Sequence, residues 1–128
     1  MNLLLDTQLL LWTAGQTARV PRRAAELIDD PSSNLTFSVV SLWEIAIKRG
    51  LNRPDFVVEP RVLRRNLLDA GYDELPVMAS HALQVQDLPP IHGDPFDRLL
   101  LAQAMVEGLT LMTTDRRLAA YPGPIQRV

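Results

Sequence analysis

Short apolar segments alternate with longer amphipathic segments along the chain. The short segments have the length of strands buried on both faces of a parallel sheet, and the longer ones space their apolar residues as helices do. The predicted strands are residues 2–5, 35–37, 74–77, 109–113 and 125–128. The predicted helices are residues 7–14, 21–30, 39–49, 60–70, 80–86, 95–107 and 116–121. This alternation favours an α/β fold, in which a central and mostly parallel sheet of four to five short strands is flanked by helices.

Signals for helix ends are clearest at two places. Asp94 and Pro95 are typical of a helix start, with Asp94 as the N-cap, and Gly108 follows the last residue of that helix. Ser38 is a typical N-cap for the helix at 39–49. The apolar stripe that we expect this second helix to bury is Val39, Leu42, Trp43, Ala46 and Ile47.

The composition fits one domain, residues 1–128, and excludes several kinds of site. The chain has 128 residues, 47% of them hydrophobic, and no cysteine. The lack of cysteine excludes a disulfide framework, a thiolate zinc site and a thiol nucleophile. No Walker loop and no G-x-G-x-x-G loop is present. No basic leader precedes the first strand and no apolar run is long enough to span a bilayer, so we expect a cytoplasmic protein without a membrane segment.

Four carboxylates occupy positions from which they can converge. Asp6 directly follows the first predicted strand, and Asp115 follows the strand at 109–113. The carboxyl ends of parallel strands meet at one edge of a sheet, where α/β proteins bind their ligands. Asp97 lies in the first turn of its helix. Glu44 lies in mid-helix, a costly place for a carboxylate unless it faces water, a partner or a metal ion.

Ordinary structural roles can account for most of these acids. Asp97 can be a first-turn acid that the helix dipole favours, and Asp115 can cap the short helix after it. Glu44 can pair with Lys48, one turn later, on a solvated face. Asp6 is the hardest to explain in this way, because it ends a buried apolar strand.

If the carboxylates converge, they repel one another, and a hard divalent cation offsets that repulsion. Mg²⁺ and Mn²⁺ prefer oxygen ligands and need only a few carboxylates, whereas Zn²⁺ is disfavoured in a chain with no cysteine and two histidines. Such an ion can activate water and shield a phosphodiester during in-line attack.

Four sequence motifs contain these acids: LLLDTQLLLW at 3–12, SVVSLWEIAIKRG at 38–50, LPPIHGDPFDRLLLAQA at 88–104 and LMTTD at 111–115. Together they resemble the PIN domain family and, within it, the VapC-type ribonuclease toxins of type II toxin–antitoxin systems. The resemblance extends over residues 2–128. It implies a PIN-like three-layer fold and an endoribonuclease that uses Mg²⁺ or Mn²⁺ on RNA. It also implies a toxin that inhibits translation and growth and is held inactive by a small antitoxin protein. The expected assembly is a homodimer or a dimer of toxin–antitoxin heterodimers.

The resemblance assigns roles residue by residue. It implies that the catalytic and metal-binding acids are Asp6, Glu44, Asp97 and Asp115. It implies hydroxyl groups near the metal at Thr7 and at Thr113 or Thr114. His92 and Arg98 flank the acidic block and can contact phosphate, or they can be a loop residue and a solvated cation at the helix start. Asp94, besides its role as N-cap, is a further supporting candidate. Many relatives of this branch have histidine directly after the first Asp-Thr pair, whereas this chain has Gln8, which can form hydrogen bonds but cannot titrate.

Three aromatic side chains are expected to be structural. Trp12 and Trp43 are more typical of a core than of base-stacking platforms. His81 is expected in a helix beneath the core. A serine triad is disfavoured, because Ser38 and Ser41 fit as helix-start residues and no G-x-S-x-G motif is present.

Two alternative functions follow from the same features. A catalytically inactive PIN-like binding module would have the same fold, and Mn²⁺ binding would separate it from the enzyme. A phosphoacceptor receiver domain shares the length, the alternation and the acid after the first strand. It also needs an aspartate after a middle strand and a lysine late in the chain, and here no aspartate follows residues 35–37 and Lys48 is the only lysine.

The charge balance permits an RNA partner once the cluster is considered. The formal net charge is −2, which by itself disfavours binding to nucleic acid. The rest of the chain is net positive when the four carboxylates of the cluster and the neighbouring Asp94 are set aside, and nearly all of its basic residues are arginine. We therefore expect RNA to bind poorly without metal and better once the cluster is neutralised.

Overall fold

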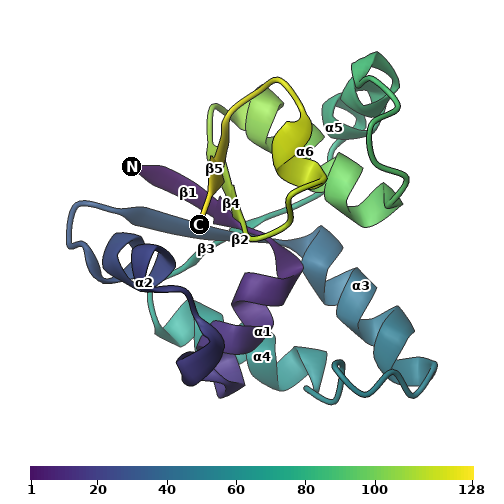
Figure 1. Ribbon diagram of the computed structural model, residues 1–128. Helices are drawn as coiled ribbons and strands as arrows, with labels where there is room; N and C mark the ends of the chain where they lie inside the picture. Colours follow the sequence, from purple (N-terminus) through teal and green to yellow (C-terminus); the bar gives the residue numbers. More distant parts are fainter.

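The computed structural model describes all 128 residues and contains one five-stranded parallel sheet. Its strand order is β3-β2-β1-β4-β5, and every neighbouring pair is parallel (Figure 1). The strands are β1 (Asn2–Leu5), β2 (Asn34–Ser38), β3 (Asp73–Leu75), β4 (Thr110–Thr113) and β5 (Ile125–Arg127). The predicted α/β fold with a central parallel sheet is confirmed. The third strand ends before Pro76, which cannot donate to a ladder hydrogen bond, and so it is shorter than predicted.

Six α-helices and three 3₁₀ turns connect the strands. The α-helices are α1 (Thr7–Gly15), α2 (Arg22–Asp29), α3 (Val39–Gly50), α4 (Pro60–Asp69), α5 (Ala79–Gln84) and α6 (Pro95–Glu107). The 3₁₀ turns are η1 (Thr17–Arg19), η2 (Val85–Asp87) and η3 (Leu118–Ala120). The helix predicted at 116–121 is only the turn η3, and η1 was not predicted. None of the helices combines the length and the apolar character needed to cross a membrane.

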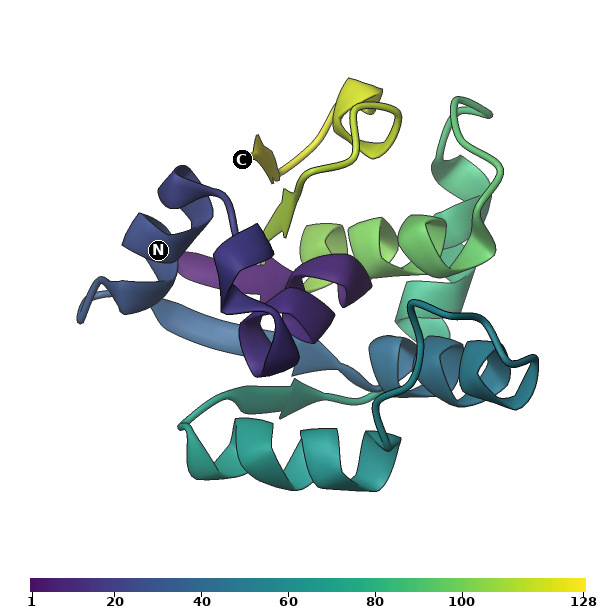
Figure 2. The ribbon, with the colours of Figure 1, turned by 60° about the horizontal axis from the view of Figure 1, so that its bottom comes forward.

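Helices cover both faces of the sheet because the strands are apolar on both sides. Leu3 and Leu5 of β1 point into a core formed with α1, α2 and α4, whereas Leu4 points into a second core formed mainly with α6. Figure 1 shows these two helical layers on opposite sides of the strands, and Figure 2 shows the layer of α1 and α4 from its own side. The result is the three-layer arrangement expected from the sequence.

The strand order creates a switch point next to β1. The chain first passes from β1 to β2 and β3 on one side, and then crosses to β4 and β5 on the other side. At such a point the loops after two neighbouring strands diverge and leave a crevice at the carboxyl ends of the strands. Residues that follow β1 and β4 therefore face a common space.

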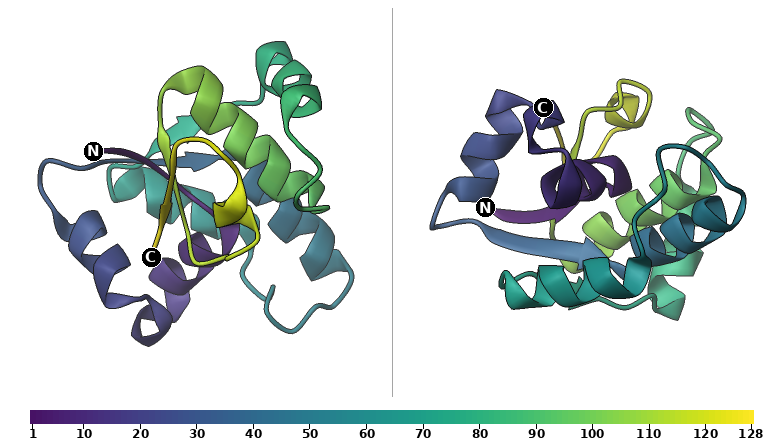
Figure 3. Two further views of the ribbon diagram at one scale, coloured as in Figure 1. Left: turned by 45° about the horizontal axis from the view of Figure 1, so that its top comes forward. Right: turned by 90° about the horizontal axis from the view of Figure 1, so that it is seen from below.

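Helix α3 buries a different face from the one predicted. Its apolar stripe lies outward, where Trp43 is 56% exposed and Ile47 is 38% exposed. The buried residues of this helix are Val40, Ser41, Glu44 and Ile45. The prediction of a core position for Trp43 was wrong, because α3 packs through a partly polar face: Ser41 accepts a hydrogen bond from Thr7 of α1. Both views of Figure 3 place α6 beside α3, where Trp43 meets Phe96 edge to face with ring centroids 5.2 Å apart.

Candidate functional site

A polar cavity of about 360 Å³ opens at the carboxyl ends of β1 and β4, at the switch point. Phe56 is its only hydrophobic lining residue. The polar lining residues are Asp6, Thr7, Gln8, Glu44, Lys48, Arg53, Asp55, Asp94, Asp97, Thr114 and Asp115. All four carboxylates singled out in the sequence therefore lie at one cavity, although they come from four different parts of the chain.

Asp6 is held rigidly at the end of β1. It is only 4% exposed, and its Oδ1 accepts a hydrogen bond of 2.8 Å from the backbone N–H of Leu9, which caps α1. Its Oδ2 accepts a hydrogen bond of 2.5 Å from the hydroxyl of Thr113 at the end of β4. Burial raises the pKa of Asp6 to about 6, although both hydrogen bonds oppose that rise.

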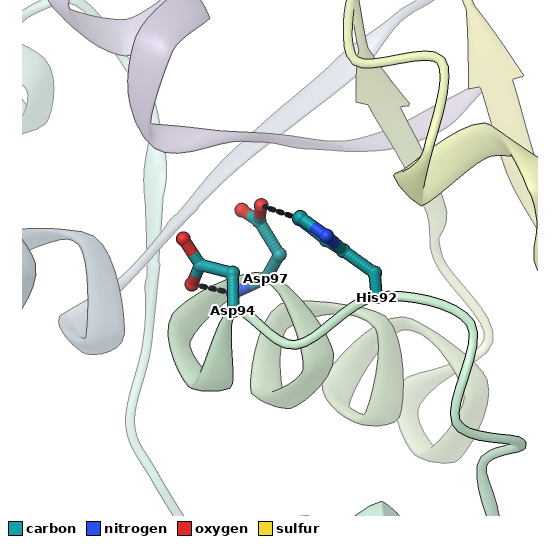
Figure 4. Close-up of side chains that lie close together, drawn as sticks. All are labelled: His92, Asp94 and Asp97. Carbon is teal, nitrogen blue, oxygen red and sulfur yellow. Dashed lines mark hydrogen bonds and ion pairs between the residues drawn. The ribbon is translucent and has the colours of Figure 1, made fainter.

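Asp97 lies in the first turn of α6, next to two other polar side chains (Figure 4). Asp94 caps the helix as predicted, because its Oδ1 accepts hydrogen bonds from the backbone N–H groups of Phe96 and Asp97. The Oδ2 of Asp97 lies 3.0 Å from Nε2 of His92. Burial, and next the charge of Asp94, raise the pKa of Asp97 to about 7. Oxygen and nitrogen atoms of His92, Asp94 and Asp97 lie within 4.8 Å of one another, which is close enough to share an ion.

Glu44 is buried and has a single charged partner. Its side chain is 6% exposed, and its Oε2 lies 2.5 Å from Nζ of Lys48, one helical turn later. Its Oε1 is buried and has no hydrogen-bond partner. The pair with Lys48 was correctly anticipated, but it lies in the wall of the cavity and not on a solvated face.

Asp115 is linked to Asp6 through one threonine. Its backbone N–H donates a hydrogen bond of 3.0 Å to the hydroxyl of Thr113, which in turn donates to Asp6. Its side chain caps the turn η3 by accepting hydrogen bonds from the backbone of Arg117 and Leu118. The Oδ2 of Asp115 lies 3.8 Å from Nε2 of His92. Thr113 thus orders the ends of β1 and β4 together.

The remaining polar candidates near the cavity divide into two kinds. Thr7 is buried, and its hydroxyl donates a hydrogen bond of 2.9 Å to the hydroxyl of Ser41, which fixes α1 against α3. Thr114 and Gln8 are partly exposed and line the cavity. Ser41 was expected to act only as a helix-start residue, and its bond to Thr7 was not anticipated.

Arg98 lies away from the cavity and braces a loop. Its guanidinium donates hydrogen bonds to the carbonyls of Pro89 and Val85, at 3.0 and 3.2 Å, and to the hydroxyl of Tyr121 at 2.8 Å. That hydroxyl accepts from the backbone N–H of His92 and donates to its carbonyl. Loop carbonyls thus take up much of this donor, and the phosphate contact for Arg98 stays a prediction. Through Tyr121, Arg98 helps to hold His92 beside Asp97.

Sequence reasoning missed several residues of this region. The sequence indicates Lys48 only as a helix partner of Glu44, and it gives no functional signal for Arg53, Phe56 or Tyr121. One signal in the sequence did indicate that Lys48 lies at the cavity. It follows Glu44 by four residues, so the two side chains lie on the same face of the helix. Arg53 and Phe56 lie in an irregular loop whose path the local sequence does not determine.

The donor set fits a hard divalent cation. Asp6, Asp97 and Asp115 present carboxylate oxygens to one small cavity, and buried Glu44 adds an oxygen without a partner. The raised pKa values of Asp6 and Asp97 reflect carboxylates buried without sufficient positive charge. Mg²⁺ or Mn²⁺ bound among these oxygens would supply that charge.

The chain matches known proteins over almost its whole length. The family model of the PIN domain matches residues 3–124. The chain is 27% identical over 127 residues to Ribonuclease VapC22 of Mycobacterium tuberculosis (strain ATCC 25618 / H37Rv), and the match covers 96% of this chain and 94% of that protein.

Solved structures share the fold at low sequence identity. VapBC2 from Rickettsia felis, bound to a DNA fragment from its promoter, matches with a TM-score of 0.74 at 12% identity and covers 100% of this chain and 99% of the other. VapBC-5 from Mycobacterium tuberculosis, a member of the VapBC family of toxin–antitoxin systems, matches with a TM-score of 0.65 at 19% identity and covers 99% and 98%. These likenesses support the three-layer fold described above.

Proposed function

The chain belongs to the PIN domain family, and on that premise we propose that it is a metal-dependent endoribonuclease that hydrolyses phosphodiester bonds of RNA. The observation that carries the proposal is the convergence of Asp6, Glu44, Asp97 and Asp115 on one cavity at the switch point of the sheet. The likeness to a curated VapC ribonuclease supports RNA as the substrate. The receiver-domain alternative is excluded, because the family model of the PIN domain matches residues 3–124, which is nearly the whole chain.

We propose that the carboxylates of Asp6, Asp97 and Asp115 hold Mg²⁺ or Mn²⁺. An ion bound there would neutralise the carboxylates and polarise a phosphate oxygen of the substrate. The partnerless oxygen of Glu44 orients the attacking water, because it is the one buried carboxylate oxygen here that has no hydrogen-bond partner. His92 and Thr113 act through the carboxylates and not on the ion itself, since each contacts a carboxylate and fixes its orientation.

RNA would approach over arginine side chains next to the cavity. Arg53 lines the cavity itself, and Arg116 and Arg117 follow Asp115 directly and are exposed. Arginine binds phosphate through two parallel hydrogen bonds, which positions a backbone but carries no sequence information.

We further propose that the protein is a toxin that acts in the cytoplasm, forms a homodimer and is controlled by a small antitoxin. The outward apolar stripe of α3 supports a protein partner, because a contiguous apolar surface on an isolated chain is typical of an interface. A groove of about 480 Å³ between α3 and the start of α4 continues this surface through Val39, Leu42 and Trp43. Purification from the native host should therefore yield a stoichiometric small protein together with this chain.

The function itself is tested by incubating the purified chain with total cellular RNA and mapping the fragment ends. We expect cleavage with Mg²⁺ or Mn²⁺, loss of cleavage with a chelator, and recovery when the ion is restored. Calorimetry with Mn²⁺ separates the alternatives. Binding of Mn²⁺ without cleavage of any RNA would favour an inactive PIN-like module, and absence of both would contradict the metal site as well.

A further inference from the structure

Lys48 is the only lysine of the chain, and it is fixed in the wall of the carboxylate cavity. Its Nζ lies 2.5 Å from Oε2 of Glu44, 4.9 Å from the ring centroid of Phe56 and 5.5 Å from that of Phe96. Its side chain is only 20% exposed. An ion pair and two aromatic rings thus hold the ammonium group in one place, and cation–π attraction adds to the ion pair.

This position affects how Glu44 can be used. A divalent ion that took the partnerless Oε1 of Glu44 as a ligand would lie next to the ammonium group that contacts Oε2 of the same carboxylate. The two cations would repel each other strongly at such a separation in a poorly solvated wall. Glu44 would then have to release Lys48, which has no other acidic partner in the structure.

The chemistry of lysine suits this place. An ammonium group is a compact point charge with three donors, whereas a guanidinium is a broad planar fork. The other 12 basic residues of the chain are arginine, and the one compact cation lies at the carboxylate cavity.

Building on the proposed ribonuclease function, we propose that Lys48 replaces a second divalent ion. The chain then binds one ion, through Asp6, Asp97 and Asp115, and not through Glu44. The ammonium group of Lys48 contacts a non-bridging oxygen of the scissile phosphate from the Glu44 side, which makes Lys48 a catalytic residue. Lys48 donates no proton in this role and acts only through its charge and its hydrogen bonds.

Calorimetric titration with Mn²⁺ tests the stoichiometry without reference to activity. We expect one Mn²⁺ per wild-type chain and two per chain in Lys48→Met, in which Glu44 is released. The double variant Lys48→Met/Glu44→Gln should return to one ion, and Lys48→Arg should stay at one. Glu44→Gln alone should bind Mn²⁺ with an affinity within about threefold of wild type. Thermal melting of each variant shows that it is folded.

Single-turnover cleavage of RNA tests the contact with phosphate. At an Mn²⁺ concentration that fills only the first site, Lys48→Met should cleave on the order of 100-fold more slowly than wild type. Higher Mn²⁺ should restore part of that rate in Lys48→Met but not in the double variant, which has lost the second site.

Several results would overturn the proposal. Two ions in the wild type, or a loss of Mn²⁺ affinity of more than tenfold in Glu44→Gln, would make Glu44 a metal ligand. One ion in folded Lys48→Met together with an unchanged cleavage rate would reduce Lys48 to a structural partner. If Lys48→Met does not fold, Glu44→Gln and Lys48→Arg still decide the question. If the wild type binds one Mn²⁺ but cleaves no RNA, the proposed function fails. The number of Mn²⁺ ions bound by wild type and Lys48→Met still tests whether Lys48 replaces a second ion.

Discussion

The hydroxyl of Thr113 donates a hydrogen bond of 2.5 Å to Oδ2 of Asp6, across 107 positions of sequence. The contact follows from the register of two parallel neighbours, in which Leu5 of β1 lies opposite Met112 of β4. The residues that follow this pair, Asp6 and Thr113, are both polar and lie at the same edge of the sheet. The pairing of strands, and not any local motif, therefore sets the orientation of the first carboxylate.

Replacing Thr113 with valine should weaken metal binding. Valine has nearly the same shape but offers no donor, so the pKa of Asp6, already raised to about 6 by burial, should rise further. Mn²⁺ affinity measured by calorimetry at neutral pH should fall by about tenfold or more. Thr113→Ser keeps the hydroxyl and should bind nearly as wild type does. Equal affinities in all three proteins would contradict this role.

Replacing Arg98 with lysine should destabilise the fold without changing the contacts with RNA. Lysine cannot reach the carbonyls of Pro89 and Val85 and the hydroxyl of Tyr121 together, so hydrogen bonds to a charged donor are lost. The free energy of unfolding in denaturant should fall by about 2–3 kcal/mol. The salt dependence of RNA binding should keep its slope, because no phosphate contact is removed. A shallower slope would instead support a phosphate contact for Arg98.

Local signals in the sequence were sufficient for the elements and for part of the site. Asp94 caps α6 and Gly108 follows the helix with a φ of 70°, as the Asp-Pro start and the glycine after the end predicted. That Asp6 and Asp115 line the same cavity also followed from the sequence, because each follows a predicted strand and the strands are parallel. His81 is fully buried, as expected, and lies 3.0 Å from Glu107.

The orientation of α3 and the role of Arg98 depend on long-range packing, which local sequence patterns do not reveal. The periodicity of α3 identified an apolar stripe but not the direction in which it faces, since the sheet side of this helix must supply Ser41 to Thr7 and Glu44 to the cavity. The brace formed by Arg98 and Tyr121 joins residues 23 positions apart, and nothing near either residue signals it. Such contacts are set by how the elements pack and not by the pattern within any one of them.

The metal-free protein should lose stability as pH rises. Burial raises the pKa of Asp6 to about 6 and that of Asp97 to about 7, so the folded state binds protons that the unfolded state has released. The free energy of unfolding should therefore fall between about pH 4 and pH 7, with a slope of about 1.4 kcal/mol per pH unit for each carboxyl that stays protonated only in the folded state. Thermal melting in a chelator measures this, and Asp97→Asn should flatten the profile. A melting temperature that rises over this range in the wild type would contradict the assignment.

Replacing Trp43 with serine should affect association more than stability. The side chain is 56% exposed, so its loss should cost about 1 kcal/mol or less in denaturant unfolding. If the outward face of α3 binds a partner protein, Trp43→Ser should shift the mass measured by light scattering, or weaken capture of the co-purifying small protein. Ser32→Ala, on an exposed turn elsewhere, is the matched surface control. Association unchanged in both variants would remove α3 from the interface.

The most direct test of the central claim compares RNA cleavage by the wild type, Asp97→Asn and Asp69→Asn, each shown to be folded and free of contaminating nuclease. Asp97 lies at the cavity, whereas Asp69 is exposed at the end of α4. With Mn²⁺ present, Asp69→Asn should cleave as the wild type does, and Asp97→Asn should be slower by about 100-fold or more. Full cleavage by Asp97→Asn would contradict the proposed site and, with it, the metal-dependent mechanism.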